Sequence, residues 1–316
     1  MNIKKYFFLL SVLLLSCCTS GVWAQTDTAG DNTDDLAKML NDKSAASKAK
    51  PANYYVAATF KATRIINSQS IENTGKGVLD FRISHRFGEV TEGVKNLYGL
   101  DNATTRFGFD YGLTSWLTIG VGRSSFEKEY DGFFKVKLLR QTTDNHHPLS
   151  ISYVGGISVQ TMDVNNVPGY TYCFSNRLYY VDQLILARKF SKRFSLQLMP
   201  TYLHCNLATH INDPNDILAI GIGGRMKVSK RIAITGEYYY NLPDHKLTGY
   251  NNSLSVGIDI ETGGHVFQIF VTNSSAITER TFIGETTGDP FKGDMHIGFN
   301  ISRVFTVVHP KELRNN

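Results

Sequence analysis

The chain carries a hairpin pattern in which apolar and polar side chains alternate with a period of two. Apolar side chains occupy every second position from Phe107 to Leu113, a turn follows at Thr114, and the alternation resumes from Leu117 to Val121. Successive side chains of a β-strand point to opposite faces, so each strand has one apolar face and one small or polar face. Similar hairpins turn at 191–193, 229–231 and 262–264. The pattern predicts an all-β protein built from consecutive antiparallel hairpins.

Strand follows strand along most of the chain, and about twelve can be placed. The expected strands are 78–87, 103–113, 116–126, 133–141, 149–161, 177–190, 194–205, 217–228, 232–241, 253–261, 266–273 and 295–305. Short and long connections alternate between them, which gives an even strand number and places both ends of the sheet on one side. The prediction is a single antiparallel up-and-down transmembrane β-barrel.

Residues 54–66 also read as a strand, and adding this strand alone would make the count odd. Three placements are open: inside the lumen, in the periplasm, or at the seam of the barrel beside a further strand. The last placement gives the alternative of a barrel with about fourteen strands.

The N-terminus has the features of a signal peptide at residues 1–24. Lys4 and Lys5 precede an apolar stretch at 6–15, and a cleavage motif ends at Ala24. A rival interpretation is a lipoprotein box that ends at Cys17. We expect a polar periplasmic leader at 25–52, the β-barrel at 53–309 and a C-terminal tail at 310–316.

Many alternating strands behind a secretion signal favour a transmembrane β-barrel. If the strands lie in a membrane, they must form a closed barrel, because lipid leaves unpaired backbone groups without hydrogen-bond partners. A soluble β-sandwich could alternate in the same way, but aromatic side chains near strand ends favour interfacial girdles. These are Phe190, Phe194, Tyr202, Tyr238, Tyr240 and Phe305. The sequence therefore predicts the cell outer membrane as the location and its lipid as a partner.

Net charge and cysteine content bear on two questions, nucleic-acid binding and disulfide formation. The net charge of +5 is modest and the basic residues are scattered, so no nucleic-acid partner is expected. Cys173 and Cys205 follow the signal region, and a disulfide between them would require the intervening loop to fold back. Two separate thiols are the alternative.

Charged residues at expected inward-facing positions are the candidate lumen-lining residues. They are Asp80, Arg82, Arg86, Arg106, Asp110, Lys135, Lys137, Arg225, Lys227, Glu237, Asp259 and Glu261. The early strands carry mainly basic residues, whereas Glu237, Asp259 and Glu261 form an acidic group. Opposed charges could create a transverse field in a pore, or could pair and close a narrow barrel. The sequence leaves both interpretations open.

The sequence lacks the common motifs for catalysis and cofactor binding. The sequence has no phosphate-binding loop, no CxxC pair and no HExxH motif. His146 and His147 fall in a predicted turn, and His204 is too far along its strand from Ser195 for nucleophilic catalysis. We therefore expect no catalytic residue, no metal site, no cofactor and no enzymatic activity.

Two parts of the sequence resemble a known family. The run 60–67 followed by 77–88 carries the resemblance, as does 264–268 with 272–274. The family consists of outer-membrane-type β-barrel proteins of Bacteroidota and is classed as a domain of unknown function. The resemblance covers nearly all of the chain beyond the signal region, and it implies a barrel and an envelope location without implying a mechanism.

The expected function is that of a channel or small-solute transport protein, with a small solute or ion as the ligand. The alternative is a closed barrel that acts as a scaffold or docking platform through external loops at 162–176 and 274–294. A membrane-embedded enzyme is the weakest hypothesis. The sequence identifies no protein partner.

Overall fold

The computed structural model describes residues 54–162, 173–208 and 213–308. The compact unit that contains them spans Ala52–Asn316. The predicted signal peptide, the lipoprotein alternative at Cys17, the leader up to residue 53 and most of the C-terminal tail lie outside the described residues.

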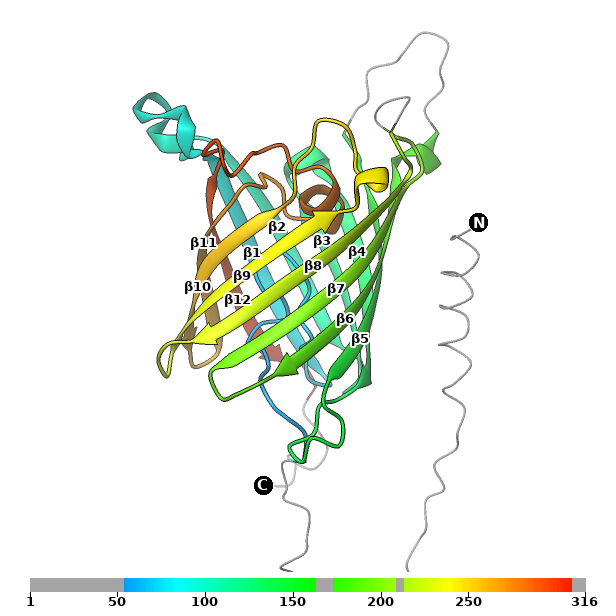
Figure 1. Cartoon of the computed structure of the whole chain (residues 1–316), viewed down its shortest axis with the longest axis vertical. Coiled ribbons are helices and arrows are strands. Elements are labelled where there is room, and N and C mark those ends of the chain that lie inside the picture. Colours follow the sequence, from blue (N-terminus) through cyan, green and yellow to red (C-terminus); the bar gives the residue numbers. More distant parts are fainter. Residues whose placement is uncertain (1–53, 163–172, 209–212, 309–316) are drawn as a thin grey trace, which may run out of the picture. The chain divides into compact units, whose positions relative to one another are not determined.

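Twelve antiparallel strands form one closed barrel (Figure 1). They are β1 (Val78–Glu89), β2 (Ala103–Gly112), β3 (Leu117–Ser124), β4 (Tyr130–Leu139), β5 (Ser150–Val159), β6 (Leu178–Lys189), β7 (Phe194–Cys205), β8 (Asp216–Lys227), β9 (Ile232–Asn241), β10 (Leu254–Thr262), β11 (His265–Thr272) and β12 (His296–Thr306). The prediction of a single up-and-down barrel is confirmed. The alternative of fourteen strands is wrong, because β1 pairs directly with β12 from Val78↔Thr306 onward.

The connections differ between the two ends of the barrel. At the lower end in Figure 1, here called the short-turn end, most hairpins turn within a few residues, although 140–149 is longer. The long-loop end carries the 3-10 helices and one π-helix. These are η2 (Val90–Glu92), η3 (Val94–Gly99), η4 (Phe126–Lys128), η5 (Phe174–Arg177), η6 (Pro243–His245) and the π-helix η7 (Arg280–Gly284).

The alternation along each strand separates an outer face from an inner face. On β8, Ile220 and Ile222 are exposed on the outside, whereas Gly221 and Gly223 between them point inward and are buried. An apolar outer face is the arrangement that lipid favours. Within the described residues, none of the helices is long and apolar enough to cross a membrane.

Residues 54–77 enter the lumen from the short-turn end and form no strand (Figure 1, blue). Only isolated bridges occur here: Tyr55 pairs with Thr142, and Arg64 pairs with Gln69. The expectation of a strand at 54–66 is therefore wrong, and of the three placements the lumen is correct. Residues 59–74 are hereafter called the plug, because most of their side chains are buried inside the barrel.

The connection between β11 and β12 also turns into the barrel, at the opposite end. It carries η7, whose Phe282 and Ile283 are 0% exposed. The alternative function requires 274–294 to be an external docking loop, but much of this loop is buried in the barrel mouth. Its apolar side chains pack on the inner wall instead: Phe282 stacks edge-on against Tyr239 at 5.4 Å between ring centroids.

The core is thus inside the barrel. Phe60, Ile65 and Ile71 of the plug belong to one buried apolar cluster with inward side chains of β5–β9 and with η7. Burial of apolar side chains stabilises the folded chain by about 1.5–3 kcal/mol for each large one. The plug is accordingly part of the folded interior.

Candidate functional site

All twelve candidate residues lie at inward positions of their strands, and most of them are buried against the plug or paired with other wall residues rather than facing open water. Arg82 is 2% exposed, and Arg86 and Lys135 are 0% exposed. Sequence reasoning identified these charges and missed their partners, because most of the partners are backbone groups of the plug, which no sequence pattern marks. The hint was the surplus segment at 54–66, for which the lumen is one of three open placements.

Glu237 on β9 holds the tip of the plug. Its carboxylate accepts hydrogen bonds from the backbone N–H groups of Ile66, Asn67 and Ser68 at 3.3, 2.8 and 3.1 Å, and from the Ser68 hydroxyl. The tip is a tight turn in which the Ile65 N–H donates to the Ser68 carbonyl at 2.9 Å. A carboxylate that collects several N–H groups forms charge-assisted bonds, which are stronger than neutral ones.

Lys135 on β4 holds the plug from another side. Its ammonium group donates to the carbonyl oxygens of Thr63, Ser70 and Glu72 at 3.3, 3.1 and 2.7 Å, and to the Gln69 side chain at 3.2 Å. The backbone of the plug therefore offers its N–H groups to an acidic residue and its carbonyl groups to a basic one. The opposed charges of the wall are matched by the peptide dipoles of the plug.

Neutral amides of the wall complete these contacts. Gln268 and Asn300 donate to the carbonyls of Ile65 and Ile66 at 2.5 and 2.9 Å. Gln197 accepts from the Ile71 N–H at 2.9 Å and donates to the Gln69 carbonyl at 2.7 Å. Buried backbone groups need such partners.

Arg86 joins the plug to β1, β11 and β12. Its guanidinium donates to the side-chain oxygens of Asn67 at 2.5 Å and Asn300 at 3.1 Å. The same group lies over the Phe270 ring at 4.1 Å from the centroid, which compensates part of its desolvation.

Thr63 of the plug bridges a charged group on β1 and β2. Its hydroxyl lies 3.1 Å from both Asp80 and Asp110 and 2.9 Å from Arg82, which pairs with Asp80 at 3.5 Å. These three candidate residues are therefore brought together around one plug side chain.

The other candidates pair with the wall or with the rim of the plug. Arg106 forms an ion pair with Asp131, and Arg225 pairs with Glu261 and lies 3.9 Å from Asp259. Glu261 also meets Lys61 of the plug at 3.4 Å. Lys137 and Lys227 make none of these plug contacts.

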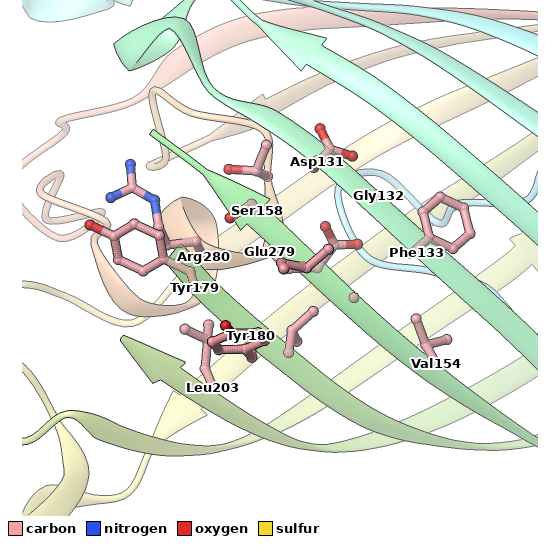
Figure 2. Close-up of a pocket in the computed structure, with 14 residues that line it drawn as sticks. Asp131, Gly132, Phe133, Val154, Ser158, Tyr179, Tyr180, Leu203, Glu279 and Arg280 are labelled. Carbon is pink, nitrogen blue, oxygen red and sulfur yellow. The ribbon is translucent and has the colours of Figure 1, made fainter. Parts of the chain in front are cut away.

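The long-loop mouth contains a second charged cluster, centred on Arg280 of η7, which lies beside Tyr179 in Figure 2. Arg280 forms ion pairs with Glu127, with Glu129 at 3.5 Å and with Glu285 at 3.1 Å, and its guanidinium lies over the Tyr179 ring at 4.4 Å. Burial would lower the pKa of Arg280, but Glu285 and Glu129 outweigh it and raise that pKa. Burial raises the pKa of Glu129, and it raises that of Glu285 to about 7.

Two cavities border the residues that fill the lumen. A vestibule of about 500 Å³ opens at the short-turn end between the plug and the inner faces of β10–β12 and β1. Near the long-loop end, the space drawn in Figure 2 between Asp131, Phe133, Val154 and Glu279 measures about 20 Å³. That volume holds about one water molecule. Of these two spaces, the one at the short-turn end is by far the larger.

Two further chemical features complete the description. No disulfide joins Cys173, which is exposed, to Cys205, which is buried. Within residues 54–162, 173–208 and 213–308, no group of three or more His, Cys, Asp or Glu side chains is placed to hold a metal ion.

Comparison with known proteins gives one family. Residues 60–305 match the family model described as "Membrane bound beta barrel domain (DUF5777)". The match begins inside the plug and ends in β12, so plug and barrel fall within one family domain. A search of curated proteins gives no match.

Several solved structures are similar in fold. The NanC porin and the KdgM porin each share 10% identity with the chain at a TM-score of 0.44; the alignments cover 72% of this chain and 98% and 99% of theirs. The outer membrane protein Omp33 of Acinetobacter baumannii shares 9% identity at a TM-score of 0.38, covering 72% of this chain and 97% of that one.

Proposed function

Because this chain belongs to the family of membrane-bound β-barrel domains, we propose that it passes small polar solutes across the outer membrane and that its own plug gates the lumen. In the closed state described above, residues 59–74 occupy the lumen. Passage requires this segment to leave its site on the wall.

The observation that carries the proposal is the polar character of the plug's anchorage. The plug tip is held by Glu237, Lys135, Gln268 and Asn300, and each of these groups can bond to water when the plug leaves. Exchange of one hydrogen-bond partner for water costs only about 0.5–1.5 kcal/mol net. The same groups would then form a polar, charged pathway of the kind that ion-selective pores use.

The apolar part of the anchorage opposes opening. Ile65 and Ile71 pack into the cluster on β5–β9, and exposing both would cost about 3–6 kcal/mol. The closed state is therefore the main one in the resting protein, and openings are rare without an opening signal.

The vestibule fits this proposal. It lies at the short-turn end, where β1 begins and β12 ends, and charged groups of Lys61, Glu72 and Glu261 line it together with apolar side chains. We assign this end to the periplasm, as expected for an exported barrel with short periplasmic turns. A signal acting on the plug would then come from the periplasmic side.

Conductance in a planar lipid bilayer tests the proposal. Two folded proteins are compared: the mature chain, and a variant in which residues 59–72 are replaced by a glycine-serine linker of equal length. We expect no steps or rare ones from the mature chain and sustained discrete steps from the linker variant. Folding of both is verified by the shift in gel mobility on heating.

A matched control replaces residues 94–99 by the same kind of linker. This segment lies at the long-loop end outside the lumen, so its replacement should leave the mature chain silent. Silence of the folded plug-linker variant would contradict the proposal and favour a permanently closed barrel.

The second candidate function is that of a closed barrel that serves as a docking platform for a protein partner, and one observation favours it. At the long-loop end, η3 and the residue after it leave Val94, Leu97, Tyr98 and Leu100 exposed, and an apolar patch of this kind marks interaction surfaces. On this hypothesis, the 94–99 linker would abolish capture of a protein partner while leaving the barrel folded. We propose no catalytic role for the barrel.

A further inference from the structure

The outer wall of the barrel carries a polar patch at positions where lipid-facing side chains are expected. The patch, hereafter the outer polar patch, lies on β5–β8 toward the long-loop end. It consists of Tyr153, Tyr180, Asp182, Tyr202, His204 and Asp216. Strand alternation fixes their outward direction, because the residues between them, such as Val181 and Leu203, point inward.

Strand register makes the outer polar patch continuous. Asp182 pairs with Tyr202, Tyr180 pairs with His204, and His204 pairs with Asp216 across neighbouring strands. The Asp216 carboxylate lies 2.6 Å from Nδ1 of His204 and accepts the Tyr202 hydroxyl at 2.7 Å. The Tyr153 hydroxyl donates to Asp182.

Asp182 stands out because its carboxylate has a hydrogen-bond donor but no positive charge beside it. Within the described residues, no Lys, Arg or His lies within ion-pair distance of it, whereas Nδ1 of His204 lies 2.6 Å from Asp216. A carboxylate on the lipid-facing surface is costly unless a cation or water compensates it. Its surroundings therefore favour a cationic group from outside the protein.

An apolar groove of about 470 Å³ adjoins Asp182 on the same surface. The groove is lined by Ile119, Phe134, Ile157 and Tyr180. Gly132, at its base, has no side chain to fill it. A Cβ atom added to Gly132 would meet only the Gly120 carbonyl oxygen, at 3.8 Å, so the space above it is open. The groove has the chemistry of a site for an alkyl chain.

The position of the outer polar patch along the barrel indicates headgroup depth. Toward the short-turn end, the outward positions next to it are apolar: Leu184 and Leu186 on β6, Leu196 and Leu198 on β7. Tyrosines at the edge of an apolar band lie at the level of lipid headgroups. A lipid chain in the groove would thus place its headgroup beside Asp182.

We propose that the outer polar patch and the groove bind a bilayer lipid with a primary-amine headgroup. The ammonium group pairs with the Asp182 carboxylate and donates to the tyrosine hydroxyl oxygens, and one acyl chain lies over Gly132. This site lies outside the lumen and is independent of gating.

Native mass spectrometry of the full mature chain tests the assignment. The protein is released from mixed vesicles of phosphatidylethanolamine, phosphatidylcholine and phosphatidylglycerol, and the lipid that remains bound is counted. We expect preferential retention of phosphatidylethanolamine, at least about tenfold lower retention in Asp182→Asn, and recovery in Asp182→Glu. One lost charge pair at a desolvated site corresponds to about this factor.

A second pair of variants separates the contribution of the groove to lipid retention from that of the Asp182 charge. Gly132→Leu fills the groove without changing charge and should also lower retention. Gly236→Leu is the matched control, because Gly236 is an outward glycine on β9 with comparable space around it. Each variant must first show the gel shift of a folded barrel.

Three results would overturn the proposal. The first is equal retention of all three lipids by the native chain. The second is unchanged phosphatidylethanolamine retention in both Asp182→Asn and Gly132→Leu. The third is retention that depends on added Mg²⁺ instead of the headgroup, which would assign Asp182 to a divalent cation.

Discussion

Arg64 of the plug and Glu279 of the β11–β12 loop form an ion pair at 2.7 Å inside the lumen. The two residues are separated by most of the chain, and their segments enter the barrel from opposite ends. Gln69 also donates to Glu279, at 3.3 Å. The plug and the β11–β12 loop are therefore joined by polar contacts inside the lumen. A change that loosens one of these segments should loosen the other.

The first prediction concerns this pair. Glu279→Gln removes the charge that compensates the buried Arg64, and removal of one partner of a buried pair costs about 3–5 kcal/mol. Hydrogen exchange should then accelerate both in the plug and in 276–286. Acceleration in the loop alone would show that the two segments are not coupled. Asp289→Asn is the control, because Asp289 lies half-buried in the same loop and pairs with Lys292 instead of the plug.

Glu237→Gln should loosen the tip of the plug. The amide keeps one acceptor oxygen but loses the charge shared by three backbone N–H groups, a loss of about 1.5–3 kcal/mol. The open fraction should rise about tenfold to a hundredfold. Trypsin reports it by cleavage after Arg64, a site that is buried in the closed state. An unchanged cleavage rate would mean that Glu237 does not restrain the plug.

Two neighbouring lysines on β4 should differ in their contribution to stability. Lys135→Met leaves the Ser70 and Glu72 carbonyls without their donor and should destabilise the barrel by at least about 2 kcal/mol. Lys137→Met removes an inward lysine that makes none of these contacts and should have a smaller effect. The temperature at which the folded gel band disappears measures both. Equal shifts would contradict the assigned role of Lys135.

Adjacent glycines on β8 provide a steric test of where the plug lies. A Cβ atom at Gly223 would approach Cδ1 of Ile65 to 2.4 Å, whereas one at Gly224 would meet its nearest neighbour, Leu196, at 3.7 Å. Gly223→Val should therefore displace the plug, and Gly224→Val should not. Trypsin cleavage after Arg64 distinguishes them; equal cleavage in both variants would place Ile65 elsewhere.

The long-loop mouth should respond to pH. Burial raises the pKa of Glu285 from its ordinary 4.5 to about 7, and that of Glu129 is also raised. Glu285 and Glu129 thus bind their protons more tightly when the β11–β12 loop is docked than when it is released. Docking is most stable below the ordinary pKa and weakens as pH rises through about 7.

Hydrogen exchange in 276–286, corrected for intrinsic rates, should therefore increase between pH 5.5 and 8.5. Glu285→Gln should flatten this dependence, because it keeps the side chain neutral at every pH. A native loop whose protection rises with pH would reverse the expected sign.

The barrel was predictable from sequence because its strands obey a local rule. Period-two alternation and turn residues locate each strand to within a few residues, as in 194–205, which is β7 in the structure. The alternation of short and long connections then gives the even strand number. Neither inference needs information about distant contacts.

The contents of the lumen were not predictable in the same way. Residues 54–66 alternate like a strand, yet Ile65 and Ile71 face apolar inner residues of β5–β9 rather than a neighbouring strand. The inward surface of β5–β9 includes Ile185, Met199 and Ile217, which alternation alone assigns to either face. Charges such as Glu237 and Lys135 were found, but their partners are backbone groups, which no sequence pattern marks.

If the plug tip lies against the inner wall of the lumen, a disulfide should be able to trap it there. The Asn67 amide donates to the Ser255 hydroxyl on β10 at 2.9 Å, so cysteines at these two positions come within bonding reach. Asn67→Cys with Ser255→Cys is made in a chain whose Cys173 and Cys205 are replaced by serine. The control pairs Asn67→Cys with Ser152→Cys on β5, on the opposite side of the barrel. We expect a nearly complete disulfide in the first pair and none in the control. Absence of the disulfide in the first pair, with the thiol introduced by Asn67→Cys reacting readily with a membrane-impermeant reagent, would contradict it.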